Sequence, residues 1–184
     1  LVKRELDLRV YFENDAALAG LGEAVSGAGQ EFKSVVYVTV STGVGGAKIE
    51  DGRISQNAFG FAPGQQIITL EGETFGRLED YVSGEAVAKR FGCPPHELVD
   101  EKIWQDLSRY LAVGLTNTLL HWSPDCLVLG GSMFRNPGFK INILEPLLRQ
   151  YLTIFPQLPV IKLATLGDES ALRGGLHYFR LINS

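Results

Sequence analysis

The chain has 184 residues, and its composition excludes several classes of protein. Hydrophobic residues make up 45% and charged residues 21% of it, which excludes intrinsic disorder and collagen-like repeats. A formal net charge of −4 gives no general attraction to nucleic acid or to an anionic membrane. No apolar stretch approaches the ~20 residues of a membrane span, and two cysteines are too few for a disulfide framework. We therefore expect a soluble globular protein of the cytoplasm.

The predicted elements alternate between strands and helices within one compact unit. In chain order we expect a strand at 8–12, a helix at 16–24, strands at 35–40 and 47–49, a loop region at 56–75 with a short strand at 66–70, helices at 78–82 and 83–91, a long helix at 102–121, a buried strand at 126–129, a helix at 142–151, an edge strand at 160–163 and a final helix at 170–181. The strand at 35–40 is almost wholly β-branched or aromatic, whereas 102–121 shows a period close to 3.6 residues. This alternation predicts the α/β class.

The first candidate site is the glycine loop that joins the strands at 35–40 and 47–49 as an antiparallel hairpin. Its glycines let backbone N–H groups cradle a phosphate, and hydroxyl groups add donors. The residues concerned are Ser41, Thr42, Gly43, Gly45 and Gly46. The loop is not a Walker loop, and it lacks the final glycine and the following helix of the dinucleotide fingerprint. Taken alone, it is equally consistent with a tight turn that binds nothing.

Two further candidates follow predicted strands. Asp15 lies at a strand-to-helix corner, where a carboxylate can accept a proton from a substrate hydroxyl, although Asn14 and Asp15 can instead simply cap the helix. Gly130, Gly131 and Ser132 follow the buried strand, and such glycines let a flat ligand such as adenine lie against the backbone. Close packing between helix and strand explains these glycines as well.

No metal site is expected from the sequence. Cys93 and His96 have the spacing of one ligand pair, but no second pair follows at zinc-site distance. His121 and His177 are interpreted as helix-borne packing or surface residues.

Five segments, in this order, resemble the ROK family of sugar kinases and related repressors. They are 13–17 with 21–23, similar to the family's catalytic-Asp segment; 37–46 with 51–53, similar to its phosphate hairpin; 78–84, similar to its sugar-contacting helix start; 127–132, similar to its nucleotide-side strand; and 164–175, similar to its closing helix. The resemblance covers essentially the whole chain. It implies an actin-like ATPase domain, ribonuclease H-like, with a mixed sheet flanked by helices.

The resemblance also implies a reaction and a set of site residues. The family transfers the γ-phosphoryl group of ATP to a sugar hydroxyl, with Mg²⁺ screening the phosphates. Carried onto this chain, Asp15 would be the base, and Asn14, Glu79 and Gln65 would contact a hexose. The phosphates would face Ser41, Thr42, Gly43, Gly45 and Gly46, and the nucleoside would face Gly130, Gly131 and Ser132.

The stretch 62–65 departs from the family pattern. It reads Ala-Pro-Gly-Gln where the family has Glu-x-Gly-His, whose Glu and His bind sugar. The loss of two hydrogen-bonding partners, at ~1–3 kcal/mol each, argues against ordinary handling of glucose or N-acetylmannosamine. The family's zinc-binding cysteines also have no counterpart at 72–77, so no structural zinc is expected. We expect Phe59, Phe61 and Phe75 to fill that region by packing instead.

The chain resembles one part of a family member. It begins with Leu1, and nothing in it resembles the Asp-x-Gly-Gly-Thr loop of the family's N-terminal domain. We therefore expect residues 1–184 to form a single domain equivalent to the C-terminal large domain, which cannot turn over sugar unaided. The leading prediction is a sugar kinase domain, and the family resemblance implies a homodimer. The alternative is a non-catalytic sugar-sensing domain of a repressor, or a degenerate sugar-binding protein, with nucleic acid as a partner only if the parent protein carries a helix-turn-helix domain.

Overall fold

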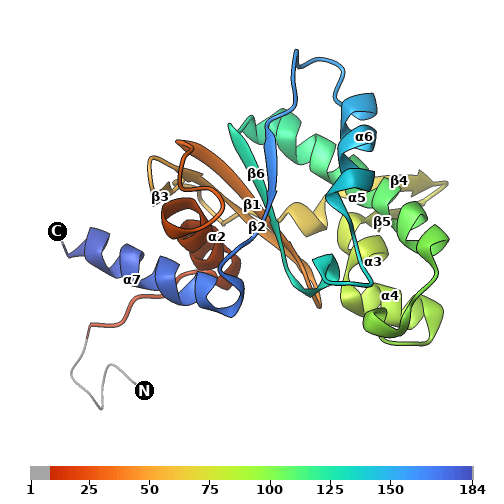
Figure 1. Ribbon diagram of the computed structural model, residues 1–184, viewed down its shortest axis with the longest axis horizontal. Helices are drawn as coiled ribbons and strands as arrows, with labels where there is room; N and C mark the ends of the chain where they lie inside the picture. Colours follow the sequence, from red (N-terminus) through yellow and green to blue (C-terminus); the bar gives the residue numbers. More distant parts are fainter. Residues whose placement is uncertain (1–8, 184) are drawn as a thin grey trace.

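The computed structural model describes residues 9–183 and contains a five-stranded sheet with helices on both faces (Figure 1). The helices are α2 (Asp15–Ser26), α3 (Leu78–Val82), α4 (Gly84–Phe91), α5 (Glu101–Trp122), α6 (Ile141–Tyr151) and α7 (Ser170–Ile182). The strands are β1 (Ser34–Val40), β2 (Val44–Glu50), β3 (Arg53–Ile54), β4 (Ile67–Glu71), β5 (Thr74–Arg77), β6 (Cys126–Gly130) and β7 (Val160–Leu163). This arrangement confirms the predicted α/β class and the mixed sheet.

The larger sheet has the order β3-β2-β1-β6-β7. Strands β1, β6 and β7 are parallel, whereas β2 and β3 pair antiparallel through the two predicted hairpins. In register, Val38 of β1 lies opposite Gly46 of β2 and Leu129 of β6. The carboxyl ends of the three parallel strands therefore meet at one edge of the sheet, which is where ligands bind in open α/β sheets.

Strand β1 divides the hydrophobic core into two parts because its side chains alternate between the faces. Val36, Val38 and Val40 belong to the cluster that α3, α5 and α6 cover. Val35 and Tyr37 point the other way, into a smaller cluster with α2. Since both faces of β1 are buried, the strand reads as a continuous apolar run.

Helices α2 and α7 touch through their backbones on the second face. A Cβ atom added at Gly174 would lie 1.8 Å from the carbonyl oxygen of Leu18, and one added at Gly22 would lie 2.0 Å from that of Ser170. Only glycine allows this approach, so the family-like segments 21–23 and 164–175 meet here.

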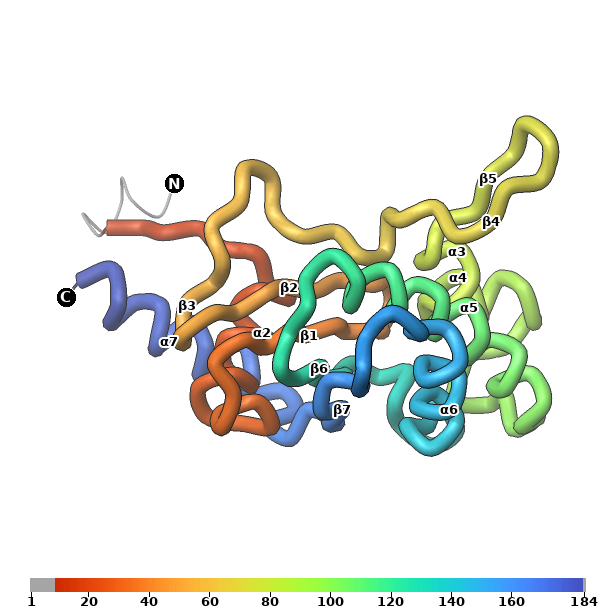
Figure 2. The backbone as a smooth tube through the Cα atoms, turned by 90° about the horizontal axis from the view of Figure 1, so that it is seen from above, coloured from red at the N-terminus to blue at the C-terminus, as the bar shows by residue number. Residues whose placement is uncertain are grey.

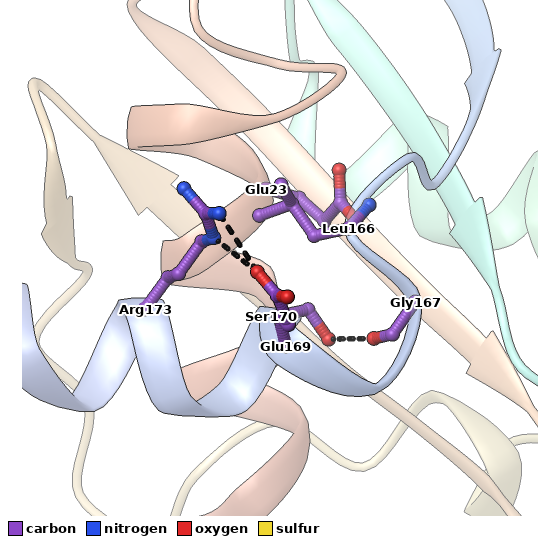
Figure 3. A network of polar contacts seen from close by, with 6 residues as sticks. All are labelled: Glu23, Leu166, Gly167, Glu169, Ser170 and Arg173. Atoms are coloured by element: carbon purple, nitrogen blue, oxygen red, sulfur yellow. Dashed lines mark hydrogen bonds and ion pairs between the residues drawn. The ribbon is translucent and has the colours of Figure 1, made fainter.

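A buried carboxylate anchors the turn that precedes α7 (Figure 3). Glu23 of α2 is fully buried, and it accepts hydrogen bonds from the backbone N–H groups of Ala28 (2.9 Å), Thr165 (3.0 Å) and Leu166 (2.8 Å). Figure 3 also shows the Ser170 hydroxyl donating to the carbonyl oxygen of Gly167 at 2.8 Å. The start of α7 is thus held against α2 at a fixed position.

Two expectations are wrong. Leu8 lies outside the described residues, and 9–12 form no strand because no neighbouring strand pairs with them and the Phe12 side chain is 90% exposed. Phe59 and Phe75 do not fill the loop region, since they are 103% and 52% exposed, whereas Phe61 packs edge-on against Trp122. The strand expected at 66–70 is present as β4, and it has a partner that the sequence analysis placed in a loop region.

That partner is β5, which pairs with β4 in a separate two-stranded sheet. The hairpin projects from the body of the molecule (Figure 2). The other predicted helices and strands are present, with small shifts at their ends. Within residues 9–183, no helix combines the length and the apolar character needed to cross a membrane.

Candidate active site

A cavity of about 370 Å³ opens at the carboxyl ends of β1, β6 and β7. We call it the strand-end cavity. Its walls include Tyr37, Thr39, Ser41, Gly130, Gly131 and Ser132. The structure therefore brings Ser41 of the hairpin together with the glycines after β6, as the sequence predicts. The hydroxyl groups of Ser41 and Ser132 are 3.1 Å apart, within hydrogen-bonding distance.

The two glycines after β6 are required by strands and not by a helix. Gly131 has a φ of +97°, and a Cβ atom there would lie 2.2 Å from the carbonyl oxygen of Val40. A Cβ atom at Gly130 would lie 2.5 Å from the hydroxyl oxygen of Tyr37. Helix–strand packing, one alternative from the sequence, therefore does not explain these residues. They let the end of β6 lie directly against β1 and leave the strand-end cavity open.

Tyr37 and Thr39 form a hydroxyl-bearing wall of this cavity, and the sequence analysis missed both. They lie two residues apart and so share one face of β1 with Ser41. Burial raises the pKa of Tyr37, and the nearby Glu23 and Asp15 carboxylates raise it further, although a hydrogen bond from Thr39 lowers it. Tyr37 therefore stays neutral near pH 7. Strand alternation from Ser41 back along β1 is the signal that could have found the pair.

The hairpin loop is fixed by backbone contacts at its tip. Ser41 N–H donates to the carbonyl oxygen of Gly43 at 2.9 Å, which closes the turn. The carbonyl oxygens of Ser41 and Thr42 accept from the N–H groups of Gly84 (2.7 Å) and Glu85 (3.3 Å) at the start of α4. The Ser41 N–H is therefore already paired, so donors for a phosphate must come from the hydroxyl groups and the remaining amides.

Asp15 is the first residue of α2 and is exposed. Its carboxylate accepts a hydrogen bond from the N–H of Ala16 at 2.7 Å. Asn14 caps the helix, since its side-chain oxygen accepts from Ala17 N–H at 3.1 Å. The hairpin passes close by, because a Cβ atom at Gly45 would lie 3.0 Å from that of Ala16. The capping alternative is thus confirmed for Asn14, and the Asp15 carboxylate lies free beside the hairpin.

The Glu79 side chain connects three segments through hydrogen bonds at the start of α3. Its Oε2 atom accepts from Val44 N–H at 2.7 Å, and its Oε1 atom accepts from the side-chain amide of Gln65 at 3.2 Å. Gly43 and Gly64 lack side chains where this carboxylate passes, because a Cβ atom would lie 2.8 Å and 3.3 Å from Oε2 respectively. Glu79 and Gln65, which the sequence places in one site, are therefore in direct contact.

A second, larger cavity of about 1090 Å³ lies on the other side of β2, and we call it the loop cavity. Asn14 and Gly46 line it, together with residues 55–62. A Cβ atom at Gly46 would meet Pro63 at 2.9 Å and the carbonyl oxygen of Tyr37 at 2.6 Å. The predicted residues thus fall into separate groups around the hairpin. Asn14 and Gly46 line the loop cavity, Glu79 and Gln65 meet at the start of α3 with Thr42 and Gly43 close to Glu79, and Gly45 lies beside Ala16 near Asp15. The strand-end cavity holds the remaining four: Ser41, Gly130, Gly131 and Ser132.

The described residues contain no group of three or more His, Cys, Asp or Glu side chains arranged to hold a metal ion. Cys93 and Cys126 are free thiols. Burial raises the pKa of Cys126 to about 11, so this thiol is unreactive near neutral pH.

A sequence model of the ROK family matches residues 1–181. The chain is 29% identical over 191 residues to a fructokinase of Lactococcus lactis subsp. cremoris, covering 91% of this chain and 64% of that protein. It is 25% identical over 162 residues to the xylose repressor of Bacillus subtilis strain 168, covering 77% of this chain and 42% of that protein. The chain therefore spans less than two thirds of the length of these curated relatives.

Solved structures share the fold. The ROK hexokinase of Thermus thermophilus superposes with a TM-score of 0.82 at 27% identity, covering 100% of this chain and 70% of that one. A ROK family glucokinase of Streptomyces griseus, in complex with glucose and AMPPNP, superposes with a TM-score of 0.76 at 23% identity. The match covers 94% of this chain and 69% of that one. These likenesses establish the actin-like ATPase fold, and the match over residues 1–181 shows that the chain belongs to the ROK family.

Proposed function

We propose that this chain carries the phosphoryl-transfer site of a ROK-type sugar kinase, which passes the γ-phosphoryl group of ATP to a hexose hydroxyl. Membership of the family and similarity to a fructokinase support the reaction class. The observation that carries the proposal is the exposed Asp15 carboxylate at the start of α2, beside Gly45 of the hairpin. A base at this position lies beside the hairpin and next to Asn14, which lines the loop cavity.

Asp15 acts as the general base in this proposal. One of its oxygens accepts from Ala16 N–H, and the other is free to accept the proton of a sugar hydroxyl. The hydroxyl oxygen forms a bond to the γ-phosphorus while the bond from that phosphorus to the β–γ bridging oxygen breaks, and ADP leaves. Asn14 contributes its side-chain N–H₂, because its oxygen caps α2. Glu79 and Gln65 bind sugar hydroxyls through the acceptors and donors that their mutual contact leaves free.

The strand-end cavity receives the nucleotide. Gly130 and Gly131 expose backbone that a nucleoside can approach, and the Ser132 hydroxyl adds a donor. The hairpin residues Ser41, Thr42, Gly43, Gly45 and Gly46 face the phosphates. Bound Mg²⁺ would supply screening of the phosphate charge. Such an ion can take most of its ligands from the substrate phosphates and from water, which suits a site whose described residues hold no cluster of carboxylates.

We further propose that this fold is the C-terminal large domain of the kinase, and that a second domain supplies the opposite wall of the cleft. The span of the chain against its relatives supports this division. The 184-residue chain is accordingly expected to form no sugar phosphate when incubated with ATP, Mg²⁺ and a hexose panel. Measurable phosphorylation by the purified chain would contradict the division of the site.

The test of Asp15 uses a longer protein that carries this chain. We expect Asp15→Asn to lower kcat by about 10²–10⁴-fold, because the base is lost, while the affinity for ATP stays unchanged. Glu145→Gln on α6 is the control, since Glu145 pairs at 2.7 Å with the exposed Arg149 of its own helix. An unchanged kcat in Asp15→Asn would refute the assignment of the base.

A sugar-sensing effector domain of a repressor is the second candidate. Gln65 and Ala62 stand where the family resemblance expects a His and a Glu, and the xylose repressor is among the relatives. Calorimetric titration separates the two functions. A kinase domain binds ATP with Mg²⁺, whereas a sensor binds the sugar and no nucleotide.

We also propose a homodimer in the cytoplasm. The projecting β4–β5 hairpin supports self-association, since it exposes the apolar side chains of Ile67, Leu70 and Phe75. Sedimentation velocity of the chain tests this, with a purely monomeric profile at micromolar concentration as the contrary result.

A further inference from the structure

Arg135 and Asp168 face each other at the strand-end cavity, and both line it. Arg135 follows the short helix after β6 (Ser132–Phe134), and Asp168 lies in the turn before α7 (Gly167–Glu169). Their nearest charged atoms, Arg135 Nη2 and Asp168 Oδ1, are 4.0 Å apart, and both side chains are largely exposed. An exposed ion pair at this distance holds its members weakly. Both groups can therefore exchange this contact for contacts with a ligand.

Arg135 is the basic side chain of this cavity. No other Lys, Arg or His of residues 9–183 lines it, and apart from Asp168 its polar side chains are neutral hydroxyl groups. A guanidinium group presents a planar fork of donors that matches the oxygens of a phosphate. The strand-end cavity thus has one position at which an anionic group is strongly favoured.

Asp168 gives the same cavity an acidic end. Its carboxylate repels phosphate, but it can accept hydrogen bonds from the hydroxyls of a ribose, as acidic residues do in dinucleotide sites. A nucleotide satisfies both ends only in one orientation, with its phosphates toward Arg135 and its ribose toward Asp168.

A neighbouring cavity of about 620 Å³ favours the same orientation. Arg135, Ser41 and Ser132 line both cavities, whereas Asp168 lines only the strand-end cavity. The neighbouring cavity continues to Thr42 at the tip of the hairpin. A phosphate chain that leaves the strand-end cavity past Arg135 therefore runs toward the hairpin.

We propose that Arg135 and Asp168 set the orientation of a nucleoside triphosphate in the strand-end cavity, with Arg135 binding the phosphates and Asp168 the ribose hydroxyls. The inference rests on the proposed kinase function, because it takes a nucleotide as the ligand. It adds two binding residues to the site and gives each a separate chemical target.

The two assignments predict opposite ligand preferences, which calorimetry on the 184-residue chain measures. We expect Arg135→Ala to weaken the binding of ATP by about tenfold and to leave adenosine within twofold, because only ATP carries phosphates. Arg135→Gln keeps most of the side chain but removes its charge, and we expect it to change the two affinities as Arg135→Ala does. We expect Asp168→Asn to weaken adenosine severalfold and to reduce the preference for ATP over 2′-deoxy-ATP.

Matched controls remove the same charges elsewhere. Arg149→Ala and Glu145→Gln do so on α6, where these two residues pair at 2.7 Å, and they should leave every affinity unchanged. The role of Arg135 is overturned if both Arg135 variants weaken the binding of ATP and of adenosine equally, or if they weaken the binding of neither ligand. The role of Asp168 is overturned if Asp168→Asn keeps the full preference for ATP over 2′-deoxy-ATP. If the unaltered chain binds no nucleotide, this inference and the nucleotide site of the proposed function both fail.

Discussion

Glu23 makes a sharp prediction about how the fold holds the site. Its side chain is fully buried, and its two oxygens accept from the N–H groups of Ala28, Thr165 and Leu166. In Glu23→Gln one oxygen becomes an N–H₂ group. If the remaining oxygen keeps the bonds to Thr165 and Leu166, the new N–H₂ group faces the Ala28 N–H, and two donors are left buried without acceptors.

The magnitude follows from those two groups. An unpaired buried donor costs ~1–2 kcal/mol here, so Glu23→Gln should lower the free energy of unfolding by about 2–4 kcal/mol. For a domain of this size that corresponds to a fall in Tm of roughly 5–15 °C. Urea unfolding followed by circular dichroism measures the first quantity, and a thermal scan measures the second.

Glu169→Gln is the matched control for this substitution. Glu169 lies close to the same turn, but it is exposed and pairs with Arg173 four residues later in α7 at 2.7 Å (Figure 3). Loss of such a pair should change stability by less than about 0.5 kcal/mol. A Glu23→Gln protein within 0.5 kcal/mol of the unaltered chain would refute the claim that this carboxylate anchors α7.

Two further predictions concern packing and pH. Gly174→Ala should lower the free energy of unfolding by several kcal/mol, because its Cβ atom would lie 1.8 Å from the carbonyl oxygen of Leu18. This is at the upper end of the range for overpacked sites. Gly175→Ala should be tolerated, because the nearest new contact of its Cβ atom is at 3.9 Å. Comparable urea midpoints for Gly174→Ala and Gly175→Ala would contradict the close contact between α2 and α7. Burial raises the pKa of Cys126 from 9.0 to about 11, so the unfolded chain loses this proton first as the pH rises. The resulting stability is fully present below pH 9 and disappears as the pH approaches 11, a difference of about 3 kcal/mol. Cys126→Ala should therefore flatten the decline of the urea midpoint between these pH values. A decline of the same size in Cys126→Ala would show that another group causes it.

The elements that the sequence predicted well are those fixed by local chemistry. The strand at 35–40 is a run of β-branched and aromatic residues, and β1 (Ser34–Val40) extends it by one residue. Ser83 begins the helix expected at 83–91, and its hydroxyl accepts from Ala86 N–H at 3.1 Å at the start of α4. In each case the deciding contacts lie within a few residues along the chain.

The elements that it missed depend on distant partners. β5 (Thr74–Arg77) has only four residues and contains Gly76, and it forms because β4 pairs with it. The segment 9–12 has strand propensity and no partner, so it stays irregular. Strand formation is decided by pairing, and pairing is not encoded in the residues of one segment alone.

The same distinction applies to the site. The glycine segments at 41–46 and 130–131 could be found because close backbone approach and a positive φ require glycine at fixed places in the sequence. Arg135 and Asp168 could not, because each becomes part of the strand-end cavity only when β1, β6 and β7 align their carboxyl ends. Short sequence motifs indicate where the backbone requires a particular residue type, whereas the polar residues that line the cavity are brought together only by the assembled sheet.

Gln65 shows how the chain accommodates its departure from the family pattern, and it supplies a final prediction. Its side-chain amide donates to Glu79 at 3.2 Å, so Glu79 keeps a partner and the hairpin stays anchored through Val44. The replacement therefore alters the groups offered to a sugar without loosening the fold. Gln65→His should leave the unfolding midpoint nearly unchanged and tighten the binding of at least one hexose by about fivefold to tenfold, the value of one added hydrogen bond. Calorimetry against a hexose panel measures this, with Gln105→His on the exposed face of α5 as the control. Identical hexose affinities in the two variants would show that position 65 does not face the sugar, and that the His in the family pattern has no equivalent here.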